Sequence, residues 1–210
     1  MRPSPTPLLT DDGRLTPMAV DLLAALAAVD RELLIRARVI RTGADVLWFP
    51  WYRRRRGGGA FVVGRTIRFT PNWYAASGYG RSSFGDRSRR STLRWLMHLA
   101  HEVGHLPQAE RFGQQALGRL RYLLAFAGQY GSRALLGRWP VHDGAPLERE
   151  ADRGRWVLRE LLVQDRRKGL LLVKAVQAGD RDAVLGWLRQ STPLIGQLQT
   201  RYDRELAMAR

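Results

Sequence analysis

The stretch from His101 to His105, which reads HEVGH, constrains this chain more than any other part of the sequence. Residues four positions apart on an α-helix lie one above the other on the same face, so both imidazoles can reach one metal ion. Glu102 lies beside them and can act as a general base toward water on that ion. Ser91 or Thr92 can cap this helix, and no glycine or proline interrupts it before the motif. The spacing therefore predicts a metal-binding helix.

A third metal ligand is needed, because catalytic zinc normally takes three protein ligands and a water. The best source is the acidic stretch PLEREAD at positions 146–152, which begins a second predicted helix with proline in its first turn. Glu148 lies 43 residues after His105, which leaves room for a crossing segment and a return. Glu148 and Asp152 share a helix face, so Glu148 can bind the metal while Asp152 holds a ligand imidazole. Glu150 is expected on a different face of this helix. Two alternatives stay open: Glu150 is the third ligand instead of Glu148, or the carboxylates bind no metal and are the ordinary acidic residues of a helix N-terminus.

The two motifs together resemble the gluzincin branch of zinc peptidases, in which HExxH is followed on a later helix by Glu-x-x-Ala-Asp. In that branch the first glutamate of the second motif is the third zinc ligand, a position that Glu148 matches. Residues 61–74 also resemble the strand and turn before the HExxH helix in small bacterial metallopeptidase domains associated with contractile injection and related secretion systems. The likeness covers residues 58–160. This chain departs from the pattern in the stretch LPQ at 106–108 after the second histidine and in a long insertion before Glu148.

The expected fold is α+β, a mainly helical zincin-like domain with a small antiparallel sheet next to the metal-binding helix. Residues 1–15 are predicted to form a flexible N-terminal segment, and residues 16–210 a single metallopeptidase domain with its motif core at 58–160 and C-terminal helices at 161–210. A helical segment is predicted from Thr16 to about Gly43, capped by Thr16. Strands follow at 45–52 and 60–70, then a helix at 114–136. Thr192 and Pro193 are expected to begin one of the last helices.

Composition narrows the ligand chemistry and the expected location of the chain. Cysteine is absent from the 210 residues, so a thiolate zinc site is excluded and the ligands must be histidine and carboxylate. No apolar run reaches the roughly 18 residues of a membrane span. The first residues lack the apolar core of a signal peptide. We therefore expect a cytoplasmic protein, with the reservation that export by a dedicated secretion machine leaves no such mark.

The formal charge of +16 suggests a polyanionic partner, but its distribution is not specific. All but two of the 35 basic residues are arginine, and they are spread along the whole chain, which a genome-wide composition bias also produces. The one dense run is Arg53 to Arg56, followed by three glycines. It is interpreted as a solvated hairpin loop, with docking of nucleic acid or an acidic protein as the alternative. No recognised nucleic-acid-binding motif accompanies it.

The predicted reaction is zinc-dependent hydrolysis of peptide bonds in a peptide or protein substrate. His101, His105 and Glu148 are expected to bind Zn²⁺, while Glu102 takes a proton from the activated water and passes it to the leaving amine. The expected class is therefore a hydrolase, a zinc metalloprotease.

A tetrahedral oxyanion also needs a hydrogen-bond donor, for which His142, Tyr122 and Tyr130 are available. His142 is preferred because it lies six residues before Glu148. Two alternatives to the enzyme stay open. One is a catalytically silent, zinc-stabilised scaffold or accessory protein of a bacterial secretion or injection system. The other is a basic adaptor.

Overall fold

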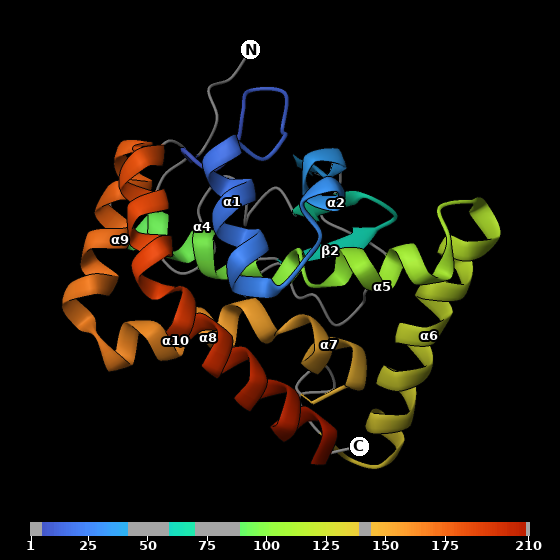
Figure 1. Cartoon of the computed structure of the whole chain (residues 1–210). Helices are drawn as coiled ribbons and strands as arrows, with labels where there is room; N and C mark the ends of the chain where they lie inside the picture. Colours follow the sequence, from blue (N-terminus) through green and yellow to red (C-terminus); the bar gives the residue numbers. More distant parts are fainter. Residues whose placement is uncertain (1–5, 42–58, 70–88, 139–143, 209–210) are drawn as a thin grey trace.

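The computed structural model describes residues 6–41, 59–69, 89–138 and 144–208, which form a mainly helical α+β fold around a small sheet (Figure 1). The strands are β1 (Arg38–Arg41), β2 (Ala60–Val63) and β3 (Thr66–Phe69), in the order β1-β3-β2. β2 and β3 pair antiparallel, whereas β1 pairs with β3 in parallel; the antiparallel partner predicted at 45–52 lies outside the described residues. The sheet is therefore mixed.

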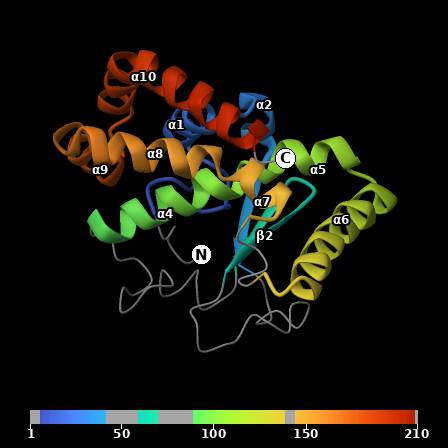
Figure 2. The same ribbon diagram turned by 90° about the horizontal axis from the view of Figure 1, so that it is seen from below.

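Helices make up most of the rest of the described chain. They are α1 (Pro17–Ala27), α2 (Arg31–Arg36), α4 (Arg89–Glu102), α5 (His105–Phe112), α6 (Ala116–Leu135), α7 (Pro146–Ala151), α8 (Arg153–Gln164), α9 (Arg166–Ala178) and α10 (Arg181–Met208). In Figures 1 and 2, α1, α4, α8, α9 and α10 form one packed group, and α6 lies apart from it along the opposite edge. Within the described residues, no helix is both long enough and apolar enough to cross a membrane.

The N-terminal helix is shorter than predicted. Thr16 caps α1 as expected, since its hydroxyl accepts a hydrogen bond from the amide of Ala19. The prediction of one helix reaching Gly43 is wrong, because Ala28 takes a left-handed conformation with φ of 53° and ends α1. Asp30 then caps α2 by accepting from the amide of Glu32, and the chain continues as β1.

The predicted strand at 60–70 is a hairpin of two short strands. Gly64 provides the turn with a φ of 60°, a conformation that favours glycine. At this turn, Arg65 pairs with Glu110 of α5 at 2.8 Å, which fastens the hairpin to the helix that follows the HExxH motif. The predicted strand at 45–52 and the run Arg53 to Arg56 lie outside the described residues.

Two further sequence predictions differ from the structure. The segment before α1, predicted as flexible, places Leu8, Leu9 and Leu15 in the hydrophobic core. Pro193 does not begin a helix but lies inside α10. The helix continues through it because buried side chains on both sides of the proline, among them Leu188 and Ile195, keep the same helix face against the core. The division of the chain into domains stays a prediction.

A buried carboxylate connects α1 with two other helices. Asp21 lies on the buried side of α1 and accepts hydrogen bonds from Arg31 at the start of α2 and, at 2.9 Å, from Arg181 at the start of α10. Burial acts to raise the pKa of Asp21, but the hydrogen bonds from the two guanidinium groups outweigh it and hold the pKa below its usual value. Asp21 is therefore ionised at neutral pH and joins segments 160 residues apart.

We predict that Asp21→Asn lowers the free energy of unfolding by about 1–3 kcal/mol at pH 7, because it removes a charge-assisted acceptor for two arginines. The folded-state pKa is lowered, so this contribution is complete above the unfolded pKa of about 3.9 and is lost as the pH falls through the folded value. Urea unfolding of both proteins between pH 7 and pH 3 measures the difference. Glu205→Gln, which breaks an exposed pair with Arg201, is the control and should change stability by less than about 0.5 kcal/mol. An equal loss in both variants, or a loss for Asp21→Asn that does not shrink below pH 4, would contradict the prediction.

Candidate metal centre

The HExxH motif lies across the junction of two helices. α4 ends at Glu102, and α5 begins at His105. The turn between them is tightened: the amide of Gly104 donates to the carbonyl of His101 at 2.9 Å, and that of Leu106 donates to Val103 at 3.1 Å. The backbone stays close to helical, with φ of −63° at Gly104, so the two imidazoles still share one side. Their ring centroids lie 5.0 Å apart.

The start of α4 differs from its prediction. The helix begins at Arg89, so Ser91 and Thr92 lie inside it and do not cap it. Both side chains are buried. The capping residues predicted from the sequence therefore lie two and three positions after the first residue of the helix. The residues before Arg89 are outside the described chain.

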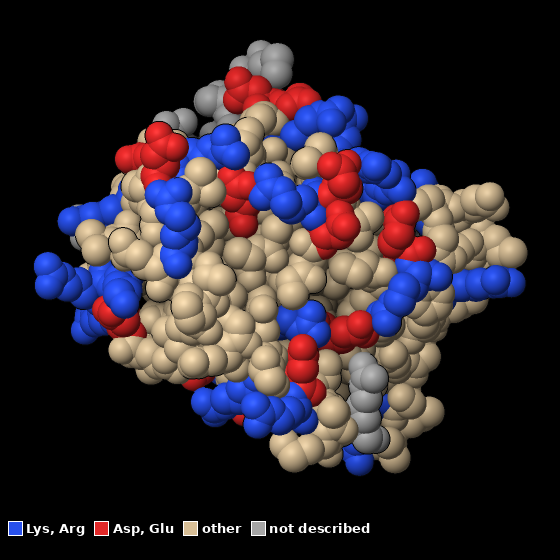
Figure 3. Space-filling view, in the orientation of Figure 1, with Lys and Arg blue, Asp and Glu red and all other residues tan. Residues whose placement is uncertain are grey.

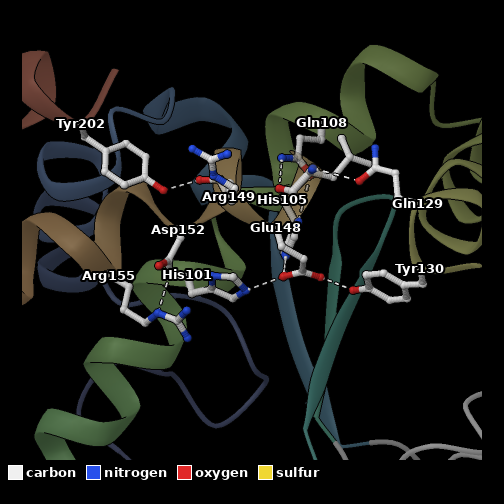
Figure 4. A network of polar contacts seen from close by, with 11 residues as sticks. His101, His105, Gln108, Gln129, Tyr130, Glu148, Arg149, Asp152, Arg155 and Tyr202 are labelled. Carbon is white, nitrogen blue, oxygen red and sulfur yellow. Dashed lines mark hydrogen bonds and ion pairs between the residues drawn. The ribbon is translucent and has the colours of Figure 1, made fainter. Parts of the chain in front are cut away.

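The structure brings the three predicted ligands together. One ligand atom of each of His101, His105 and Glu148 lies within 4.8 Å of the others, and both histidines are buried. Oε2 of Glu148 is 3.1 Å from Nε2 of His101 and 3.6 Å from Nε2 of His105. Two ligands held at about 2 Å from a tetrahedral ion lie about 3.3 Å apart. The two separations from Glu148 are close to that value, so the group could hold a metal ion (Figure 4).

Hydrogen bonds at Nδ1, the ring nitrogen that does not contact Glu148, decide which nitrogen of each neutral imidazole carries the proton. Nδ1 of His101 lies 3.0 Å from a carboxylate oxygen of Asp152, which can only accept, so Nδ1 carries the proton. Nδ1 of His105 lies 2.9 Å from Oε1 of Gln108, whose amide nitrogen donates to the carbonyl of Leu147 at 2.8 Å. Gln108 therefore accepts from His105. In their neutral forms, both rings present the lone pair of Nε2 to Glu148, as metal-binding histidines require.

The charges of the group favour a cation between the side chains. Burial acts to raise the pKa of Glu148, but hydrogen bonds with His101 and His105 outweigh it and keep the pKa far below its usual value. Burial acts to lower the pKa of His101, but Asp152 and Glu148 raise it to about 9. A positive charge next to Glu148 is therefore stabilised, whether an imidazolium or a metal ion carries it.

Glu102 is buried beside this group without a matching partner. Its side chain is 5% exposed, and its Oε2 atom has no hydrogen-bond partner among the described residues. Burial raises the pKa of its carboxyl, against the opposing charges of His101 and His105. A buried oxygen without a partner costs free energy and marks a place where a ligand or a water completes the hydrogen bond. Glu102 is not one of the three grouped side chains.

Helix α6 forms the wall on the far side of Glu148. The hydroxyl of Tyr130 donates to Oε1 of Glu148, which leaves Oε2 for the histidines. One turn away, Phe126 packs edge-on against His105 with ring centroids 5.4 Å apart. Oε1 of Gln129 accepts from the amide of Leu147 at 3.1 Å and so fixes the first turn of α7 (Figure 4).

The other sequence candidates lie as follows. Glu150 pairs with Arg111 at 2.8 Å and is not part of the group, which favours Glu148 as the third ligand. Tyr122 is buried between Phe112 and Phe126, and burial raises its pKa strongly, so its hydroxyl stays protonated. His142 lies outside the described residues.

Sequence reasoning missed Gln108 and Gln129. Gln108 follows His105 by three positions on one helix, so its contact with that ring could have been found from the spacing. Gln129 meets Leu147 only because α6 packs beside α7, which no local signal indicates.

The close approach of α7 depends on a glycine inside the motif. A Cβ at Gly104 would lie 2.2 Å from the carbonyl oxygen of Ala151, far inside any allowed contact. Any larger residue must therefore push α7, with Glu148, away from the histidines.

We predict that Gly104→Ala weakens metal binding at least tenfold, because it displaces the third ligand. Titration of the metal-stripped protein with zinc measures the affinity, and thermal unfolding measures the stability. The control is Gly128→Ala on α6, where no atom lies within 4 Å of the new methyl group. That variant should bind zinc normally and gain up to about 1 kcal/mol from helix propensity. Unchanged zinc affinity in Gly104→Ala would show that the contact with Ala151 does not position Glu148.

The chain was compared with protein-family models, with curated proteins and with solved structures, and none of the three comparisons found a match.

Proposed function

We propose that this protein is a zinc-dependent metallopeptidase. The observation that carries the proposal is the convergence of two imidazole Nε2 atoms and one carboxylate oxygen beside Glu102, whose buried oxygen has no partner among the described residues. A purely structural metal site is normally closed by four protein ligands, whereas a catalytic site has three and an open position. Among the residues that the structure describes, the group has three.

The donor set supports zinc as the metal. Two histidine nitrogens and one carboxylate oxygen match a known catalytic zinc arrangement, and cysteine is absent from the chain. Magnesium and calcium favour sites made only of oxygen ligands, which this group is not. A bound zinc ion supplies Lewis acidity, which acidifies water and polarises a carbonyl group.

The residues around the site are assigned the proton transfer and the positioning of the metal ligands. Glu102 accepts a proton at Oε2 and returns it to the leaving amine, a role that suits a carboxyl whose pKa is raised by burial. Asp152 and Gln108 hold the imidazoles in the tautomer that binds metal. Tyr130 holds the second oxygen of Glu148, so that Glu148 offers one oxygen to the metal.

The peptide substrate class is supported by the resemblance to gluzincins. The pattern HExxH with Glu-x-x-Ala-Asp matches that branch in both motifs, and the contacts of Glu148 and Asp152 agree with the roles of third ligand and imidazole partner. The silent scaffold is the competing proposal. It shares the metal site but assigns no function to the unpartnered oxygen of Glu102.

We predict one zinc ion per chain, held by the three grouped residues. His101→Ala and His105→Ala should each lose most of the zinc, because catalytic sites rarely retain the ion with two ligands. Elemental analysis of the purified variants gives the metal content. His98→Ala is the matched control: His98 is on the same helix, but it is outside the group, and burial lowers its pKa to about 3. Full retention of zinc in both ligand variants would remove the basis of the proposal.

We predict that Glu102→Gln keeps the metal and the fold but reduces peptide hydrolysis by at least a hundredfold, because the amide has nearly the same shape and cannot act as a base. A broad peptide library scored by mass spectrometry identifies a cleaved sequence, and the rate on that sequence is then compared between the two proteins. Activity that survives the substitution would refute the assigned base. Zinc binding without cleavage of any peptide would favour the scaffold.

A further inference from the structure

The outward face of α6 carries exposed leucines in its first half and at its end, with small residues between them. Its exposed leucines recur at helical spacing, with exposed fractions of 58% at Leu117, 52% at Leu120, 60% at Leu124 and 90% at Leu135. Between them, Gly128 and Gly131 have no atom within 4 Å of a built Cβ position, so the stripe stays open along the helix. Helices on protein surfaces normally turn a polar face to water. We define the α6 stripe as Leu117, Leu120, Leu123, Leu124, Ala127, Gly128, Gly131 and Leu135.

The charged residues of α6 are all arginine, since the sequence of this helix contains no aspartate or glutamate. Arg121 is exposed beside the stripe, whereas the guanidinium of Arg119 lies against the β2–β3 turn, where its Nε would be 3.2 Å from a Cβ at Gly64. On the face that Figure 3 shows, the outer edge over α6 carries uncharged and basic side chains, without acidic ones. An aliphatic face bordered by a cation is complementary to a surface that is apolar inside and anionic at its boundary.

We propose that the α6 stripe docks this protein onto an anionic lipid surface, with the leucines inserted among the acyl chains and Arg121 at the level of the headgroups. Leucine side chains on a projecting helix enter a lipid phase without needing a preformed groove (Figures 1 and 2). Each cation near such a surface contributes about 1 kcal/mol, in addition to the burial of the leucines.

A second copy of the chain fits this face poorly. α6 is 20 residues long, so a pair of stripes about 30 Å long and 10 Å wide would bury about 300 Å² per copy, well below the roughly 800 Å² of a stable interface. Pairing would also bring the arginines of both copies together, although the chain already carries a charge of +16. A protein partner is less suitable as well, because the stripe has no aromatic anchor of the kind that dominates such interfaces.

Docking through this face would hold the metal centre close to the lipid. The inward face of α6 contacts Glu148 through Tyr130 and His105 through Phe126, so the two surfaces are separated by one helix. An α-helix with its side chains is about 10 Å across. The proposal does not require catalysis, since the stripe and the metal group share no residue.

Vesicle co-sedimentation of the full chain tests the proposal. We expect binding to phosphatidylcholine vesicles containing 30% phosphatidylserine, and at least tenfold weaker binding to pure phosphatidylcholine. The double variant Leu120→Ser/Leu124→Ser should lose at least tenfold in affinity for the anionic vesicles. The matched control is Leu170→Ser/Leu171→Ser on α9, which changes two leucines of comparable exposure on another basic helix and should bind like wild type. Equal binding of both variants would attribute adsorption to total charge and overturn the proposal.

Site-specific labelling provides an independent readout that does not depend on the stability of the serine variant. Because the chain has no cysteine, Leu124→Cys and Leu170→Cys can each carry a single environment-sensitive dye. We expect a blue shift on vesicle binding at position 124 and none at position 170. No shift at either position, or a shift at both, would contradict insertion of the α6 stripe. Light scattering that shows a wild-type dimer dissociated by Leu120→Ser/Leu124→Ser would assign the face to a second copy instead.

Discussion

The metal centre depends on how closely the α7–α8 segment packs against α4 and α5. Two glycines make this packing possible: a Cβ at Gly104 would lie 2.2 Å from the carbonyl oxygen of Ala151, and a Cβ at Gly154 would lie 2.5 Å from that of Ala100. The backbone of the α7–α8 segment therefore lies against the backbone before the motif, at Ala100, and within it, at Gly104. Since α7 has only six residues, its position is set by these contacts and by its cap partner Gln129 more than by its own helical stability.

This close packing also explains the electrostatics of the site. Once α7 is in place, Glu148 and Asp152 reach opposite nitrogens of the same imidazole, at 3.1 and 3.0 Å. These two partly buried carboxylates then oppose the desolvation of His101, which is why its pKa rises although burial alone would lower it. Glu102 lies in the same buried region but receives no such hydrogen bond at Oε2, so its pKa moves in the direction that burial dictates. Neighbouring groups with different partners thus acquire different chemistry, as acid–base catalysis requires.

Local patterns in the sequence were enough to predict that His101, His105 and Glu148 come together, as a group that could hold a metal ion, and to predict the helix that forms α6. His101 and His105, and separately Glu148 and Asp152, are related by the helical repeat, which depends only on backbone geometry. The helix expected at 114–136 is present as α6. The end of α1 could not be predicted, because Ala28 adopts a left-handed conformation that its sequence does not favour. The hairpin within residues 60–70 was also missed, although Gly64 and Arg65 form a two-residue turn with positive φ at the glycine, which is a local signal for a hairpin.

Helix α6 differs from the usual surface helix because both of its faces carry apolar side chains. Its inward face carries the aromatic residues Tyr122, Phe126 and Tyr130, of which one hydroxyl binds Glu148, while its outward face is aliphatic. Exposing several leucines to water forfeits about 1.5–3 kcal/mol of burial for each. A sequence that needed only a wall for the metal centre could place polar side chains there without loss, because the outward face does not touch the site. The aliphatic stripe is therefore an independent feature of the helix, and its form fits contact with an apolar phase better than contact with water.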